Sequence, residues 1–330
     1  MSLRAQRCAI GCRCSRLARL GEPAAAWARL TVANISDSLS IGFALVGLSL
    51  AHAAVAADAD AAISGRAQIR STYLALDDSG KDVIQGGEAS DYWMLGGAGS
   101  IDADWGGPHL QADFSGEATL DERSADDTYR QSYGGGLHLG WRDPEVGSLG
   151  AFGSAGNVEI HDVGSSDPES VAWSAGLEGQ AFFERITLYL QAGYLDRESV
   201  SSGGDVDALQ NAGFGRVVAR YFCGENLKLE SEASFARGKM DPDSDTIWLV
   251  SWGAEAEYRS STLPISAFAG YSGARYEQHD DSDVLYEHRI QLGARVYWGQ
   301  TSLKSNDRTG ASLDLPRYLE WNGQIAGALE

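Results

Sequence analysis

The stretch 287–298 constrains the fold most, because its polarity alternates from one residue to the next. One face carries largely apolar side chains: His288, Ile290, Leu292, Ala294, Val296 and Trp298. The other face carries mainly polar ones: Glu287, Arg289, Gln291, Gly293, Arg295 and Tyr297. Since a β-strand places successive side chains on opposite faces, this alternation predicts a strand with one apolar and one polar surface.

Alternation of this kind recurs along the chain and predicts about twelve strands, with ten to fourteen compatible with the pattern. The predicted strands are 67–77, 91–105, 109–121, 128–142, 148–160, 170–183, 186–196, 207–222, 226–238, 246–259, 264–276 and 286–298. Short connections alternate with longer ones that are acidic and rich in Ser, Asp and Gly. This order predicts an all-β, antiparallel up-and-down sheet with the short turns at one end. The two faces of 67–77, 148–160 and 264–276 do not separate cleanly.

The alternation alone does not decide which face points inward, since a soluble barrel or sandwich would place its apolar face inside. Two features favour an apolar exterior. The apolar faces carry many Gly and Ala, which would leave a soluble core underfilled. They also end in aromatic side chains near the short turns: Trp105, Trp141, Phe183, Tyr221, Tyr258 and Trp298. Because such a row is typical of the membrane interface, we expect a transmembrane β-barrel with a polar lumen.

The first 56 residues are predicted to be an over-long leader with a secretory signal peptide rather than part of the fold. Residues 39–56 are apolar and end in Ala54-Val55-Ala56, a small-residue cleavage pattern, so we place the cleavage after Ala56. Cleavage would leave Cys223 as the single cysteine, which excludes an intrachain disulfide. The formal net charge is −20 at pH 7, and loss of the Arg-rich leader would make it more negative. Such a charge excludes nucleic acid as a partner.

The closing stretch combines polar Gln291, Gly293, apolar Val296 and aromatic Trp298 at fixed spacing. This pattern resembles the closing-strand signal that the barrel-assembly machinery reads in bacterial outer-membrane proteins. Across 65–298 the chain resembles porin-like outer-membrane β-barrel proteins. The resemblance implies a location in the Gram-negative outer membrane, in contact with lipid and lipopolysaccharide. We therefore expect three parts: the leader 1–56, the barrel 57–298 and a periplasmic C-terminal tail 299–330.

Charged residues on the polar faces form two expected walls of the lumen. The acidic wall comprises Asp102, Asp104, Asp113 and Glu117, and the basic wall comprises Arg216, Arg220 and Lys228. In a ring of twelve, the second and eighth strands lie opposite each other, so the walls would create a transverse field. The alternative is local neutralisation, for example of Arg216 by Glu232 on the next strand. A surplus of acidic lumen residues favours the passage of cations.

These features predict a passive porin-like channel for small hydrophilic solutes or ions. Twelve strands lie between the eight that side chains fill and the sixteen that leave an open channel. The alternative is therefore a closed barrel with a structural or surface-interaction role, acting through its acidic loops. A third hypothesis is an outer-membrane hydrolase, for which His138 and His288 are the histidines to consider. Since neither has a recognisable nucleophile beside it in the predicted barrel, we expect no enzyme and no catalytic residue.

Two acidic loops contain Asp-rich motifs, at 241–245 and 279–283, that resemble the start of a calcium-binding loop. Both lack the glycine and the distal glutamate of the complete motif. We therefore expect solvated acidic loops, with no metal site and no cofactor.

Overall fold

The computed structural model describes residues 61–78, 91–120, 129–161, 169–199, 209–239, 246–278 and 284–317. The strands are β1 (Ala62–Asp78), β2 (Asp91–Asp104), β3 (Pro108–Thr119), β4 (Tyr129–Asp143), β5 (Gly147–His161), β6 (Glu169–Phe182), β7 (Ile186–Ser199), β8 (Gln210–Phe222), β9 (Leu227–Lys239), β10 (Thr246–Arg259), β11 (Ile265–Gln278) and β12 (Val284–Trp298). A helix within the described part, α2 (Leu303–Thr309), follows. The leader, the Asp-rich loop motifs and 318–330 lie outside the described residues.

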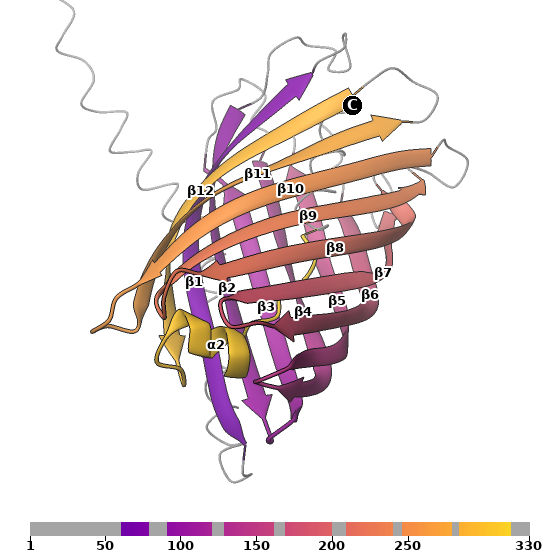
Figure 1. Cartoon of the computed structure of the whole chain (residues 1–330). Helices are drawn as coiled ribbons and strands as arrows, with labels where there is room; N and C mark the ends of the chain where they lie inside the picture. The colour runs from indigo at the N-terminus through magenta and orange to yellow at the C-terminus, as the bar shows by residue number, and fades with distance from the viewer. Residues whose placement is uncertain are drawn as a thin grey trace, which may run out of the picture.

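The twelve strands form a closed antiparallel up-and-down barrel, which confirms the predicted fold class (Figure 1). Each strand pairs with its neighbours in the sequence, and β1 pairs with β12 to close the ring. The closing ladder runs from Gly65 opposite Trp298 to Asp78 opposite Leu285. Most strand ends lie within three residues of the predicted ones, whereas β1 begins at Ala62 rather than at residue 67. A closed ring satisfies the backbone hydrogen bonds of every strand, as a lipid environment requires.

The outer face of the barrel is apolar and the inner face is largely polar. On β12, Ile290 and Leu292 are more than half exposed, whereas the intervening Gln291 and the preceding Arg289 are buried. Five of the six predicted interfacial aromatics are exposed on the outside: Trp105, Trp141, Phe183, Tyr221 and Tyr258. No helix in the described part of the chain is long and apolar enough to cross a membrane.

The lumen also contains an apolar layer, which the sequence did not predict. It lies toward the strand ends that carry the long connections and consists of Leu74, Met94, Phe152, Leu195, Leu209, Ala212, Phe214, Ala236, Ile247, Leu249, Ala274, Tyr276 and Leu285. The rings of Phe152 on β5 and Phe214 on β8 lie with their centroids 6.2 Å apart. Apart from Leu209, which directly precedes β8, the side chains of this layer belong to strands, and Leu315 from the chain after α2 packs against them.

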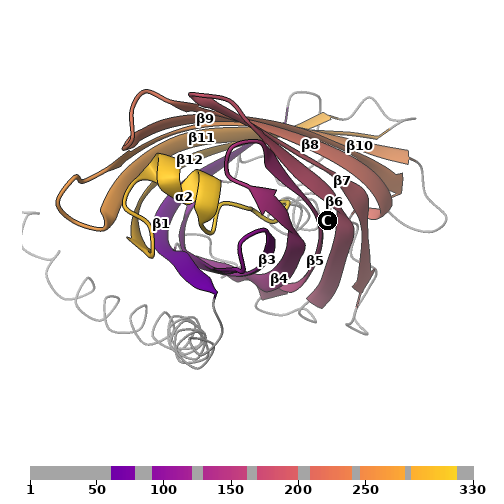
Figure 2. The ribbon, with the colours of Figure 1, turned by 60° about the horizontal axis from the view of Figure 1, so that its bottom comes forward.

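The chain after β12 turns back into the barrel, whereas we expected it to extend into the periplasm. Helix α2 lies across the mouth at the short-turn end (Figure 2). The Ser302 hydroxyl donates to the Glu225 carboxylate (3.0 Å), and the backbone N–H of Lys304 donates to the Glu225 carbonyl (3.1 Å). Beyond the helix, residues 310–317, here called the lumen segment, enter the barrel. Its side chains turn inward because Leu313 finds apolar contacts there and Asp314 finds positive charge.

Cys223 allows the orientation of the barrel to be tested, because it is exposed in the short turn between β8 and β9. If short turns face the periplasm, a membrane-impermeant maleimide should not label Cys223 on intact cells but should label it after the outer membrane is permeabilised. In a Cys223→Ser background, Ser244→Cys in a long connection should react on intact cells. Mass spectrometry would identify the labelled residue. Labelling of Cys223 on intact cells would reverse the topology.

Candidate functional site

The lumen segment is held by hydrogen bonds from two distant parts of the barrel wall. From β3, the Gln111 amide donates to the Leu313 carbonyl (2.7 Å) and accepts from the Leu313 backbone N–H (3.1 Å). From β7, Gln191 and Tyr189 donate to the Asp314 carbonyl, at 2.9 and 3.2 Å. The Leu313 side chain packs with Tyr189 and Val218 in a small buried cluster. The segment therefore spans the lumen from β3 to β7.

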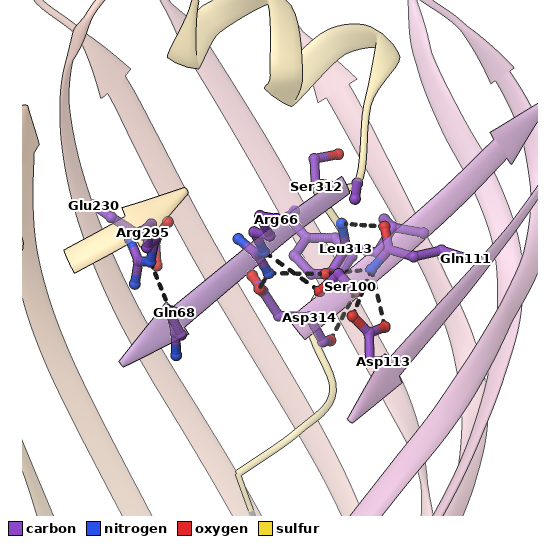
Figure 3. A network of polar contacts seen from close by, with 12 residues as sticks. Arg66, Gln68, Ser100, Gln111, Asp113, Glu230, Arg295, Ser312, Leu313 and Asp314 are labelled. Atoms are coloured by element: carbon purple, nitrogen blue, oxygen red, sulfur yellow. Dashed lines mark hydrogen bonds and ion pairs between the residues drawn. The ribbon is translucent and has the colours of Figure 1, made fainter. Parts of the chain in front are cut away.

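The Asp314 carboxylate joins two basic residues on opposite sides of the lumen. It contacts the guanidinium of Arg66 on β1 (Figure 3). It also lies 2.6 Å from the guanidinium of Arg220 on β8. Burial alone would raise the pKa of the Asp314 carboxyl, but Arg66, Arg220 and Arg216 hold that pKa well below its usual range. The carboxylate is therefore ionised at neutral pH and acts as a charged cross-link between the two walls.

Arg220 binds the tail at two further points. It donates to the Asp307 carboxylate of α2 and to the Ser312 carbonyl, both at 2.9 Å. One strand residue of the predicted basic wall thus holds the helix and the lumen segment together. Around the ring, β1 and β8 are five strands apart. Between the strands themselves, the described ion pairs join strands at most three positions apart, as in Arg289 of β12 with Glu117 of β3.

Part of the predicted acidic wall supports the residues that hold the lumen segment. Asp113 accepts from the Gln111 amide at 2.9 Å and lies 2.8 Å from His138 Nε2. On its other side, His138 Nδ1 lies 2.8 Å from Glu178, which accepts from Tyr189 and Gln191. The buried chain from Asp113 through His138 to Glu178 therefore connects the β3 and β7 contacts of the segment along the wall.

The other acidic-wall residues have partners on neighbouring elements. Asp102 is fully buried beside His109 (3.2 Å) and Arg142 (3.1 Å). Asp104 accepts from the backbone N–H of Gly106 (2.7 Å) and so stabilises the short turn after β2. Glu117 forms ion pairs with Arg70 and Arg289.

The basic-wall residues are paired in the same local way. Arg216 lies 2.7 Å from Glu232, the partner named in the local-neutralisation alternative. Lys228 lies 3.2 Å from Glu230 and 3.1 Å from Glu257. The structure thus has both walls pointing inward, with local ion pairs and with the lumen segment between them. Their effect on ion selectivity stays a prediction.

The predicted assembly signal lies on the strand that closes the barrel. Gln291 and Gly293 point inward on β12, and Val296 is exposed on the outer face. The Trp298 ring packs so closely on Gly65 of β1 that a Cβ there would lie 2.2 Å from it. Recognition of these residues by the assembly machinery stays a prediction.

The two histidines considered for chemistry lie on opposite faces of the barrel wall. His288 Nδ1 lies 2.8 Å from the Tyr271 hydroxyl on the outer face, and its ring stacks on that tyrosine. His138 is buried between two carboxylates, as described above. Within the described residues, no group of three His, Cys, Asp or Glu side chains could hold a metal ion.

Sequence reasoning missed Arg66, Tyr189, Gln191 and Asp314 as parts of the site. The signal for the lumen segment is present at 311–315, where Ala, Ser, Leu, Asp and Leu alternate in polarity like the strands before them. That short alternation indicates an extended segment with one face to bury and one charge to pair. A small cavity of about 110 Å³ remains beside it, lined by residues that include Arg66, Arg216, Lys228, Glu230 and Asp314.

Among known proteins, the chain is similar to solved structures of other barrels. No family model matches the chain, and a comparison with curated proteins finds no sequence match. The translocator domain of the autotransporter NalP from Neisseria meningitidis is 14% identical, with a TM-score of 0.43 over 78% of this chain and 97% of that one. The CymD monoaromatic hydrocarbon channel is 8% identical, with a TM-score of 0.45 over 72% and 89% of the two chains. An outer membrane channel from Pseudomonas putida F1 is 11% identical, with a TM-score of 0.45 over 71% and 95%.

The architecture itself decides the class of protein. Its twelve antiparallel strands close into a ring, with apolar side chains on the outside and ion-paired side chains within. Only a membrane satisfies such an exterior, because water would leave a continuous apolar belt unburied. The chain therefore has the fold of a membrane-spanning β-barrel, closed by twelve strands.

Proposed function

We propose that the protein is a passive channel for small hydrophilic solutes, and that the lumen segment closes it. One observation carries this proposal: the polar contacts that join opposite walls come from the C-terminal tail, through Leu313 and Asp314. A lumen closed permanently for structural reasons would need no separate segment to cross it, because strand side chains could bridge it directly.

The lumen segment is separable from the barrel. The ring is closed by the β1–β12 ladder, which ends at Trp298, before the tail begins. The tail is attached by side-chain hydrogen bonds and ion pairs, each worth about 1–3 kcal/mol, and by apolar contacts of Leu303, Leu313 and Leu315. Most strand ion pairs, such as Arg216 with Glu232, remain when it leaves. We therefore expect the barrel to persist without the tail and the polar part of the lumen to fill with water.

Single-channel conductance in a planar bilayer tests the proposal. A refolded chain that ends at Gln300 lacks α2 and the lumen segment, and we expect it to conduct ions steadily. The full-length chain should conduct much less, with brief openings when the tail detaches. A chain that ends at Arg317 is the matched control, because it loses only 318–330 and should behave like the full-length protein.

The apolar layer near the long connections favours the alternative, a closed barrel with a structural or surface role. It is filled by strand side chains such as Leu74 and Leu249, which truncation leaves in place. If the folded chain ending at Gln300 conducts no ions, this layer closes the lumen and the closed-barrel alternative replaces the channel. Equal conductance of all three chains would instead show that the tail does not block the path.

A further inference from the structure

The position of the Asp314 carboxylate suggests what the lumen binds when the tail is displaced. Most lumen acids have a basic partner on a strand, as Glu232 has in Arg216 and Glu257 has in Lys228. Arg66 differs: among the described residues its ion-pair partner is Asp314 of the tail. Loss of that carboxylate would leave a largely buried guanidinium without its ion-pair partner. An uncompensated buried charge is costly, so the position attracts a replacement anion.

The side chains around Asp314 suit a planar carboxylate better than a single spherical ion. Arg66 and Arg220 approach the carboxylate from β1 and β8, and Arg216 lowers its pKa from nearby. Arg220 lies over the Tyr189 ring, with its guanidinium carbon 5.5 Å from the ring centroid, which limits its orientations. Planar guanidinium groups match the planar carboxylate better than they match a spherical ion.

Space for a solute already exists at this point. The cavity of about 110 Å³ borders Asp314, Arg66 and Arg216. A water molecule needs about 10–15 Å³ of such volume, so the cavity holds several waters or a small organic anion. Displacement of Asp314 would enlarge it further.

We propose that Arg66 and Arg220 form a carboxylate-binding site in the lumen, which Asp314 occupies in the closed barrel and which takes a small carboxylate solute when the tail leaves. The inference rests on the proposed channel function and names its solute class. It departs from the cation preference expected from the surplus of lumen acids, because those acids are largely paired whereas the Arg66 position depends on the tail. Solute and tail compete for one site, so a bound carboxylate favours the open barrel.

Chemical rescue tests the site without relying on conductance. Asp314→Gly removes a side chain equivalent to acetate and leaves its position empty. We expect acetate at pH 7 to raise the temperature at which this refolded variant loses its heat-modifiable fold, relative to chloride at equal ionic strength. Ligands that bind only the folded state stabilise it in this way. Acetamide, which has a similar shape and no charge, should have no effect, and the wild type should respond to neither.

A second pair of variants locates the effect. Arg66→Gln in the Asp314→Gly background should raise the acetate concentration needed for half of the shift by about tenfold or more, because a charge-assisted bond is lost. Arg275→Gln in the same background is the control, since Arg275 pairs with Glu277 outside the lumen and its side chain is about two-fifths exposed. If Asp314→Gly does not refold, the chain ending at Gln300, with and without Arg66→Gln, serves for the same titration.

The outcomes separate the two proposals. Equal stabilisation by acetate and chloride, or a shift that survives Arg66→Gln, overturns the carboxylate site. A specific acetate shift in a barrel that never conducts supports the site while rejecting the channel. Conductance of the chain ending at Gln300 without any acetate shift supports the channel and rejects the site.

Discussion

Replacement of Arg295 by methionine is expected to lower the free energy of unfolding by about 3–5 kcal/mol, because it leaves buried carboxylates without their main counter-charge. Arg295 Nη1 lies 2.7 Å from Glu255 and 2.6 Å from Glu257, and its Nε donates to Gln68 at 2.7 Å. Its guanidinium also lies over the Phe268 ring, 3.9 Å from the centroid. Methionine keeps part of the packing and removes the charge. The decrease in the free energy of unfolding would therefore come mainly from the lost ion pairs.

Arg275→Met is the matched control for this substitution. Arg275 forms an ion pair with Glu277 at 3.0 Å, but both side chains are about two-fifths exposed. Such exposed pairs contribute about 0–1 kcal/mol, so the change should be small. Urea unfolding of the refolded barrels would measure both. Equal losses for Arg295→Met and Arg275→Met would show that burial does not decide the strength of these pairs.

A double substitution tests the cause. Arg295→Met together with Glu255→Gln removes one of the two carboxylate charges that lose Arg295. The double substitution should therefore recover part of the lost stability. Glu257 would retain Lys228 at 3.1 Å and hydrogen bonds from Ser266 and Tyr297, both at 2.6 Å. Because these residues share one network, their effects should not be additive. Purely additive losses would argue against a shared network.

The strands could be predicted because alternating polarity fixes both the element and its face. In 246–259 the apolar set Trp248, Val250, Trp252 is the outward one, and Glu255 and Glu257 point inward as expected. Strand pairing then followed from the short turns. In three strands, β1, β5 and β11, the apolar and polar faces did not separate cleanly in the sequence. The reason is that apolar residues of these strands, Leu74, Phe152 and Phe268, point into the lumen.

The contents of the lumen could not be predicted in the same way. The inward face of β10 begins with the apolar Ile247 and Leu249 and continues with polar residues. These two side chains belong to an apolar layer that forms only when the closed barrel brings the strands together. Likewise, Asp314 finds Arg66 and Arg220 across a space that no local pattern describes. Alternation assigns a side chain to a face, whereas partners across the lumen depend on closure of the ring.

Gly293→Ala is expected to reduce the yield of folded barrel sharply, for a reason that the sequence pattern did not supply. The Phe268 ring on β11 lies over Gly293 on β12, its cross-strand partner. A Cβ at residue 293 would lie 2.4 Å from a Phe268 ring carbon and 2.4 Å from the Ile69 backbone oxygen on β1. One contact is with the backbone of the strand that closes the ring, so the closing ladder itself would have to shift.

Overpacking of this kind costs about 1–3 kcal/mol and here acts at the seam between the first and last strands. Displacement of the Phe268 ring would also disturb Arg295, which lies over it. Heat-modifiable electrophoresis of the purified, refolded variant measures the packing effect in the absence of any assembly factor. Gly215→Ala on β8 is the control, because a Cβ there meets no atom within 4 Å. We expect it to fold like the wild type.

Trp298→Ala separates packing from recognition at the same seam. If the closing pattern is an assembly signal, this variant should refold in detergent yet reach the outer membrane of cells at a much lower level. Gly293→Ala should be impaired in both settings, because its steric conflict is present wherever β1 and β12 pair. Normal refolding of Gly293→Ala would contradict the packing argument. Normal membrane levels of Trp298→Ala would argue against an assembly signal at this seam. Gly293 would then have a structural role alone, because it leaves room for the Phe268 ring and the Ile69 backbone oxygen.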